Sequence, residues 1–397
     1  MTPRTKTERS NPERSSQSGF SLVELMVSIA IGMVVLLGLS AVYIAAKQSF
    51  RFQETSGRLQ EDAVFALEGI ARDLRMAGFA GCRGIVAEAG PIYYPRMSIS
   101  PAPSAYDSAN PMAAVIAVTD PNYALVVAQP LSPQNFLRGF DNVPAAMFAA
   151  GGAPVTGVTD SLFFSGGGPN AVSVSTAMAS ASSNLAIASD TYGWGSSASY
   201  NANSQVINFV VSDCVSSGVF AGKISGGGTQ IDHSAALGNA SNNFAGSPVF
   251  GVDALVMPVE WSFYYVATRA GAETPSLYKA SYNGNKRLGP EELVSNVETI
   301  KFHYGENTQN VVATGEPTLQ ADVWRTTAAA VTDWSRVVAV RVGLIMLSGE
   351  QNANTDITVV SPTLLGQVYA PPVGASPNRL RKEFSTTVVL RNRVAPR

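Results

Sequence analysis

Residues 19–46 read GFSLVELMVSIAIGMVVLLGLSAVYIAA, and this stretch decides how the chain is organised. From residue 25 to residue 46 no side chain is charged, a run of 22 residues. A helix of about 20 residues, rising about 1.5 Å per residue, crosses the roughly 30 Å hydrocarbon core of a bilayer. The stretch therefore predicts one membrane-spanning helix near the N-terminus.

The apolar stretch could also be a secretory signal peptide or a plain signal anchor. A secretory signal peptide has an apolar region of only about 7–15 residues that ends at a cleavage site, whereas here the helical pattern continues. A plain signal anchor explains the length of the span but not Glu24, which lies at its start. A carboxylate in the membrane costs a few kcal/mol, so it is usually partnered or functional unless it lies near the interface and reaches water.

Composition excludes several classes of function. The chain has 397 residues, with 27 Lys and Arg against 29 Asp and Glu. This balance leaves no basic field for a phosphate backbone, so we expect no nucleic-acid partner. The two Cys, at positions 82 and 214, and the two His, at positions 233 and 303, lack the close paired spacing of a structural zinc site, and no residue pattern requires a cofactor or catalysis.

The stretch GFSLVE at residues 19–24 resembles the processing motif of type IV prepilins, with a polar leader of net charge +2 before it. The resemblance implies that a membrane peptidase cuts after Gly19 and that the new N-terminal Phe20 is methylated. It also implies that Glu24 is an assembly residue, because the ammonium group of Phe20 in one subunit could neutralise Glu24 of a neighbour. Such a pair specifies register more reliably than it adds stability.

Beyond the span, helical character continues, since no proline lies between Pro12 and Pro91. Apolar residues at spacings of three and four predict an amphipathic face, and glycines near residue 80 predict its end. The members of this face are Leu59, Ala63, Ala66, Leu67, Ile70 and Leu74. One helix from about residue 20 to about residue 80 would be about 90 Å long. It resembles the spine that pilins share.

The C-terminal region predicts four strands by alternation of apolar and polar residues, around residues 259–265, 300–304, 338–346 and 384–390, and Asn283-Gly284 predicts a turn. The middle of the chain is poor in charge, with 12 charged residues among the 168 at positions 83–250. Its short apolar runs, such as 162–164 and 206–211, predict strands between long loops. We expect a pilin-like α+β fold in which the long N-terminal spine packs on a C-terminal antiparallel β-sheet, with a large loop-rich β insertion.

The expected domains are a leader at 1–19 that is removed, a spine at 20–82 with its membrane and filament-core part at 20–46, the insertion at 83–250, and the sheet at 251–397. Loose motifs spread along the chain, among them RMAGFAGC at 75–82 and ELVSNVE at 292–298, resemble large minor pilins of the PilW type. The resemblance implies single-pass insertion in the inner membrane with a periplasmic C-terminal domain. It also implies that the protein primes pilus assembly together with other minor pilins. Its further partners would be the major pilin, the prepilin peptidase and methyltransferase, and the inner-membrane assembly platform.

Two exported thiols in an oxidising periplasm most economically form one disulfide, so we expect Cys82 to pair with Cys214, and two buried free thiols are the alternative. Other constellations have ordinary explanations. The glycine runs 166–168 and 226–228 lack a phosphate-loop lysine and predict flexible turns. His233 is expected in a surface loop and His303 on the surface of a sheet, and no acidic spacing predicts a calcium site.

Two rival functions remain open. The same spine serves minor pseudopilins of type II secretion, and the charge-poor insertion could be an adhesive module at the pilus tip. An anchored periplasmic enzyme would need a convergent cluster of acidic residues or histidine.

The mature N-terminus tests the processing motif. Mass spectrometry of the protein purified from membranes should find a chain that begins at methylated Phe20. An intact Met1, or cleavage after residue 46, would contradict the prediction.

Overall fold

The computed structural model describes most of the chain in ranges separated by gaps. Two units, Met1–Glu54 and Thr55–Arg397, are described separately below. The described residues are 19, 21–81, 136–143, 152–154, 159–195, 206–213, 217–237, 239, 241–244, 249–283, 286–308, 320–349, 362–372 and 379–393.

Helix α1 spans Leu22–Met76 and has 55 residues, as the proline-free pattern predicted. It ends where Gly78 takes a φ of 72°, in the left-handed region that glycine enters without a steric penalty. The N–H of Gly78 donates to the carbonyl of Ser165 at 2.8 Å instead of continuing the helical ladder. The end of the helix is therefore hydrogen-bonded to a strand.

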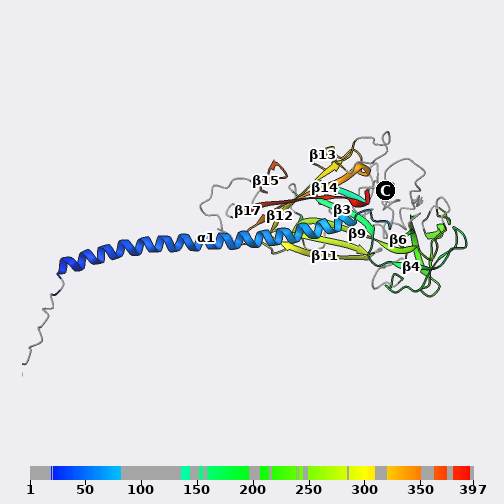
Figure 1. The fold of residues 1–397 in the computed structure, drawn as a ribbon, viewed down its shortest axis with the longest axis horizontal. Helices are drawn as coiled ribbons and strands as arrows, with labels where there is room; N and C mark the ends of the chain where they lie inside the picture. The colour runs from blue at the N-terminus through cyan, green and yellow to red at the C-terminus, as the bar shows by residue number, and fades with distance from the viewer. Residues whose placement is uncertain are drawn as a thin grey trace, which may run out of the picture. The chain divides into compact units, whose positions relative to one another are not determined.

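The strands form two main antiparallel sheets, and their chain order is marked in Figure 1. The larger sheet contains β1 (Leu137–Phe140), β2 (Gly152–Pro154), β3 (Ser161–Gly167), β4 (Val172–Thr176), β5 (Leu185–Ile187), β6 (Val206–Ser212), β7 (Ser217–Ser225), β8 (Gln230–Asp232), β9 (Leu255–Arg269), β10 (Ser276–Asn283) and β11 (Lys286–Ser295). The smaller sheet has the order β13 (Val323–Arg325), β12 (Val297–Glu306), β14 (Val337–Leu347), β17 (Arg381–Val389). A two-stranded ribbon joins β15 (Thr363–Leu364) to β16 (Gln367–Val368). Short 3₁₀ helices cover Ala235–Leu237, Trp334–Arg336 and Arg391–Arg393.

All four strands predicted in the C-terminal region are present, but they do not share one sheet. β9 lies in the larger sheet, whereas β12, β14 and β17 form most of the smaller one. The predicted turn is consistent with the β10 and β11 hairpin, in which Asn283 is opposite Lys286. Alternation identified the strands correctly and carried no information about which strands pair.

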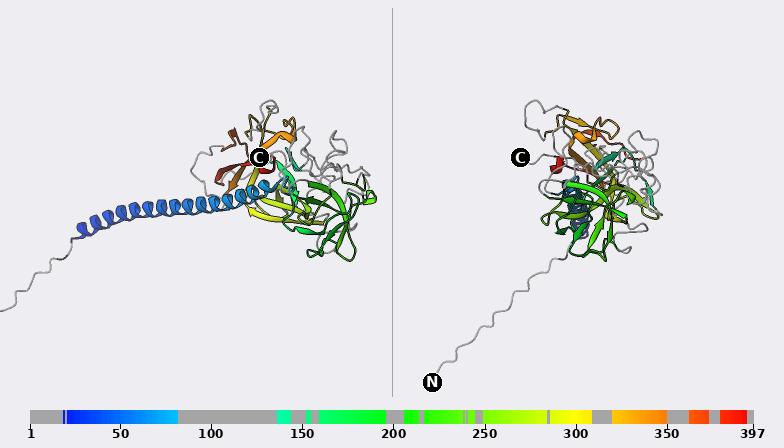
Figure 2. Two further views of the ribbon diagram at one scale, coloured as in Figure 1. Left: turned by 45° about the vertical axis from the view of Figure 1, so that its right-hand side comes forward. Right: turned by 90° about the vertical axis from the view of Figure 1, so that its right-hand side faces the viewer.

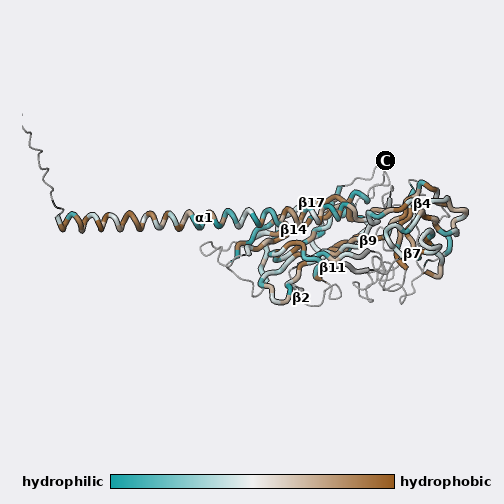
Figure 3. The backbone as a smooth tube through the Cα atoms, turned by 90° about the horizontal axis from the view of Figure 1, so that it is seen from below, coloured by the Kyte–Doolittle hydropathy of each residue, from teal (hydrophilic) through white to brown (hydrophobic). Residues whose placement is uncertain are grey.

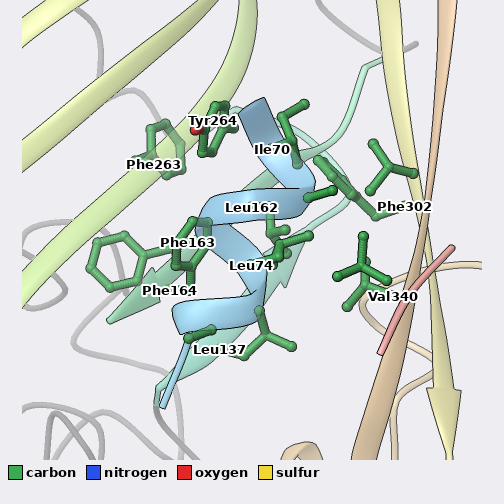
Figure 4. Close-up of a cluster of buried hydrophobic side chains, with 14 of the residues drawn as sticks. Ile70, Leu74, Leu137, Leu162, Phe163, Phe164, Phe263, Tyr264, Phe302 and Val340 are labelled. Atoms are coloured by element: carbon green, nitrogen blue, oxygen red, sulfur yellow. The ribbon is translucent and has the colours of Figure 1, made fainter. Parts of the chain in front are cut away.

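The second half of α1 packs against both sheets. Its buried residues are Leu59, Ala63, Ala66, Leu67, Ile70, Ala71 and Leu74, which include the whole predicted face. Figure 4 shows Ile70 and Leu74 with Phe163 of β3 on one side and Phe302 and Val340 of the smaller sheet on the other. One hydrophobic core therefore unites the helix with both sheets.

Asp160 connects the two sheets along the edge of β12. Its backbone N–H donates to the carbonyl of Ile300 at 2.9 Å, and its carboxylate accepts from the N–H of Phe302 at 3.1 Å. The Lys301 ammonium lies 2.6 Å from the same carboxylate. Burial raises the pKa of Asp160 to about 6, although the Lys301 charge acts in the opposite direction. A buried carboxylate thus closes part of a strand edge that would otherwise be open.

Strands from the predicted insertion close into a ring with β9. β9 pairs with both β4 and β6, and the order β9, β4, β5, β8, β7, β6 returns to β9. These strands, green to yellow-green in Figure 2, surround a second core that contains Trp194, Phe209 and Phe220. β3 of the same region also pairs with β9. The boundary drawn at residue 250 marks a change of composition, and backbone hydrogen bonds cross it.

The glycine run 166–168, which sequence analysis assigned to a flexible turn, is a packing site. Gly166 and Gly167 lie in β3. A Cβ on Gly166 would lie 2.6 Å from the carbonyl oxygen of Met76, at the end of α1. The N–H of Gly167 donates to the carbonyl of Phe79 at 2.7 Å. The glycines allow the chain after the helix to approach the strand closely. The other run, 226–228, is a turn with positive φ at each residue, as predicted.

Replacement of Gly166 by alanine tests this close approach. Because the neighbour is backbone and cannot rotate away, we expect Gly166→Ala to lower the free energy of unfolding by about 1–3 kcal/mol. Gly69→Ala is the matched control, since a Cβ at that helical position meets nothing within 4 Å. The control should be neutral or raise stability by up to about 1 kcal/mol. Equal effects of the two variants in urea unfolding would contradict the assignment.

Candidate assembly surface

The predicted processing site lies just before α1. Gly19 is exposed, and the first helical turn closes with the N–H of Leu25 donating to the carbonyl of Ser21 at 3.1 Å. Phe20 lies outside the described residues. Glu24 is exposed in the first turn, where a negative charge is favoured by the helix dipole. The helix thus begins at the motif and places the Glu24 carboxylate close to the expected cleavage point.

The first unit is a helix whose apolar side chains face outward. An 18-residue window near the N-terminus has a mean hydropathy of 2.6, and none of it is buried. Leu37 is 71% exposed and Val34 is 69% exposed. Figure 3 shows this hydrophobic part of α1 and the hydrophilic stretch that follows it. The helix is long and apolar enough to cross a membrane, and its side chains have no core of their own.

In the second unit, a half-buried polar cluster attaches α1 to the larger sheet. The hydroxyl of Tyr264 in β9 donates to the Asp73 carboxylate at 2.6 Å, and the Lys279 ammonium lies 2.5 Å from the same oxygen. Burial raises the pKa of Tyr264, and the Asp73 charge raises it further, so the phenol remains a donor. Asp73 lies outside the apolar face that helical spacing predicts. Its role depends on two partners about 200 positions away, which helical spacing cannot reveal.

Glu260 adds a second carboxylate near this cluster. It follows Val259 and precedes Trp261 in β9, and both neighbours are buried. Burial raises the pKa of Glu260 to about 7, with Lys279 lowering it and Asp73 raising it. In the sequence, Glu260 is an ordinary polar position of an alternating strand. Alternation therefore gave no sign that Glu260 would be partly covered.

A groove of about 850 Å³ runs along the outer side of α1 in this unit. Phe65 and Arg72 of the helix line it, and Phe65 is 64% exposed. Tyr264, Lys279 and Leu293 come from the larger sheet, and Thr386 comes from β17. The groove therefore exposes the helix between the edges of two sheets.

Two family models match parts of the chain. Residues 263–392 match the family model of type IV pilus-assembly protein W, and residues 14–40 match the prokaryotic N-terminal methylation motif. The C-terminal part of the chain is therefore similar to pilins of the PilW type, and its N-terminus carries the methylation motif. Pilins of this type are structural parts of the pilus and not enzymes.

A solved type IV-like pilin from Thermus thermophilus also matches, with 16% identity over 48% of this chain and 86% of that chain. Its TM-score is 0.20, so it adds no detail to the fold. A comparison with curated proteins finds no match.

Both histidines differ from expectation. His233 is buried, and its ring lies 4.4 Å from that of Phe244, with Nε2 2.8 Å from the carbonyl oxygen of Ser183. His303 in β12 is 6% exposed, and burial lowers its pKa, as do Arg341 and Lys301. Both positions were predicted to be at the surface. The pattern of residues along one segment does not show which distant segments cover a side chain, so the burial of both histidines was not predicted.

Cys82 and Cys214 lie outside the described residues, so their pairing remains a prediction. Within the described ranges, no three His, Cys, Asp or Glu side chains come together to hold a metal ion.

The raised pKa of Glu260 predicts a pH dependence of stability. A carboxyl group whose pKa is raised from 4.5 to about 7 holds its proton more tightly in the folded state. Its stabilising effect is therefore present at low pH and is lost as the pH rises through this interval. Relative to wild type, Glu260→Gln should gain of order 2 kcal/mol in free energy of unfolding between pH 4.5 and pH 7.

Urea titrations of both proteins at several pH values measure this difference. Glu292→Gln, on an exposed position of β11, is the control and should follow wild type. A constant offset between Glu260→Gln and wild type across the pH range would contradict the prediction.

Proposed function

We propose that this chain primes type IV pilus assembly at the inner membrane, as part of a complex of minor pilins that is retained at the pilus tip. The observation that carries the proposal is an exposed Glu24 in the first turn of a helix whose apolar side chains are also exposed. Such a helix is stored in a bilayer and then packs against other helices in a filament.

In this proposal the peptidase cuts after Gly19, and methylated Phe20 carries the new N-terminal ammonium. A Glu24 carboxylate in an apolar surrounding needs a positive partner, because an isolated charge there is costly. The ammonium of a neighbouring subunit supplies that partner. A subunit that is out of register leaves Glu24 unpaired, so the pair selects the axial position.

The partners are other minor pilins, the major pilin, the prepilin peptidase and methyltransferase, and the inner-membrane assembly platform. The C-terminal domain lies in the periplasm, where the Cys82 and Cys214 thiols form a disulfide. The globular unit then selects neighbours through its surface, since its cores are filled by its own side chains.

Pilus counts on cells test the role of Glu24. Cells that lack the gene should lose most surface pili, wild-type protein should restore them, and Glu24→Ala or Glu24→Gln should not. Glu292→Gln changes a carboxylate on the globular unit and should restore pili fully. Type II secretion is scored in the same cells.

The outcomes separate the rival functions. Normal pili with failed secretion would assign the chain to the minor pseudopilins. Normal pili and normal secretion would contradict priming and favour an adhesive role for the tip.

A further inference from the structure

β17 is the last strand of the smaller sheet and, among the described strands, pairs with β14 alone. Next to the pair, the N–H of Ser348 donates to the carbonyl of Leu380 at 2.9 Å, and the N–H of Leu390 donates to the carbonyl of Val338 at 2.9 Å. The direction of backbone bonding alternates along a strand, and the register of this pair has no shift. Even-numbered residues of β17 therefore bond to β14, and odd-numbered residues turn their N–H and C=O groups to the open side.

The open side of β17 carries a row of backbone donors and acceptors to which no described residue bonds. They belong to Glu383, Ser385, Thr387 and Val389. Such a row is a template for another strand, and natural proteins usually protect it with proline, charge, a bulge or short length. β17 has nine residues, and its stretch 384–389 contains neither proline nor a charged side chain.

By contrast, the edge strands β11 and β13 have such protection. β11 includes Pro290, and its pairing with β10 is interrupted by two register shifts. β13, at the opposite end of the smaller sheet, has three residues. β17 is therefore a long and regular edge without the devices that discourage pairing.

β17 runs beside the second half of α1 in the same direction, as Figures 1 and 3 show. Near its start, the Lys382 ammonium lies 3.3 Å from the Ser56 hydroxyl, and just after its end the Asn392 amide donates to the carbonyl of Arg75 at 3.1 Å. Ser385 lines the groove on the outer side of α1. Because paired strands lie about 4.8 Å apart, a strand added to β17 would lie in this groove.

We propose that the open edge of β17 binds an extended segment of a partner protein as an additional antiparallel strand. Main-chain hydrogen bonds supply the affinity of such strand addition, and alternate side chains supply its specificity. The side chains that face α1 would cover the exposed ring of Phe65 and the half-buried Leu293. The segment therefore has apolar residues at every second position and polar residues between them.

The end of the groove next to the end of β17 is basic. Arg72 and Arg75 line it and are exposed, and Arg391 is exposed just after the strand. The Asp73 carboxylate is already engaged by the larger sheet. Glu68 also lines the groove and offsets one of the three positive charges. An antiparallel segment begins at this end, so an acidic residue at its start complements the net positive charge.

The β17 strand of a second copy is not the occupant. Because β17 follows α1, antiparallel pairing of two β17 strands would make the two α1 helices point in opposite directions. Two chains held in one membrane by the same N-terminal span have helices that point the same way. The contact also makes no use of Glu24 or of the span, so it goes beyond the proposed function and does not depend on it.

A synthetic peptide tests the edge on the full chain in detergent micelles. The peptide is acetylated, begins with aspartate, continues with threonine and valine in alternation, and ends in an amide. Fluorescence anisotropy measures its dissociation constant. Ser385→Pro should weaken binding by about tenfold, because it removes an N–H on the open side without breaking a bond to β14. Ser385→Ala keeps that N–H and is the matched control, which should bind like wild type.

Methylation of the peptide backbone tests the direction of the added strand without changing the protein. Odd-numbered side chains of β17 point away from α1, since Glu383 accepts from the N–H of Leu365 in the ribbon while Phe384 packs on the core. In an antiparallel pair, opposite residues have side chains on the same face. The threonines of the peptide therefore carry the nitrogens that bond to β17. Methylation of these nitrogens should abolish binding, and methylation of the valine nitrogens should not.

Removal of one groove charge tests the acidic start of the segment. Arg75→Gln should weaken binding of the peptide by about fivefold at low salt, and it should have no effect on a peptide that begins with asparagine. Arg269→Gln removes an exposed charge that does not line the groove and should bind both peptides like wild type.

Hydrogen exchange resolved to single residues gives a second measurement. Without peptide, the amides of Ser385 and Thr387 should exchange quickly and those of Thr386 and Val388 slowly, and the peptide should protect the first pair. Protection of the first pair without peptide would show that the chain itself covers the edge, and protection that grows with protein concentration would show that a second copy does. Either result would overturn the proposal.

Failure of wild type to bind the peptide would also overturn it. So would equal binding by wild type and a Ser385→Pro variant whose circular dichroism shows a retained fold.

Discussion

The apolar face of α1 between Leu59 and Leu74 is the constraint on which the globular unit depends, because both main sheets pack against it. Ala63, Ile70 and Leu74 are completely buried. Burial of one large aliphatic side chain contributes about 1.5–3 kcal/mol, so the helix face and its partners outweigh any single polar contact. The second half of the helix is therefore part of the globular domain.

Polar contacts then fix the position of α1 along the larger sheet and the position of β12 relative to Asp160. Asp73 is half-buried against Tyr264 and Lys279, and Asp160 is buried against Lys301 and the backbone of β12. Buried charges are costly when unpaired, so a shifted helix or strand would leave these carboxylates without partners. Burial raises the pKa of Asp160 to about 6. Asp160 therefore both specifies the arrangement and makes it sensitive to pH.

β9 extends the fold beyond one core. It has 15 residues, and Val256 near its start belongs to the ring of strands, whereas Trp261 belongs to the core around α1. β9 therefore connects the core around the helix to the core inside the charge-poor ring. Because the strands of the ring pair in a closed order, each of them has a hydrogen-bonded neighbour on both sides along part of its length.

The sequence by itself determined the long helix, its buried face, the four C-terminal strands and the methylation motif at the N-terminus. These features are local, because they depend on periodicity, proline positions and contiguous motifs. Only the tertiary structure decided that the strands divide into two sheets, that the middle region closes on β9, that Gly166 lies under the end of α1, that Asp73 bonds to the larger sheet, and that both histidines are buried. Each of these depends on residues far apart in the chain, and a pattern along one segment does not contain the pairing partners that burial requires.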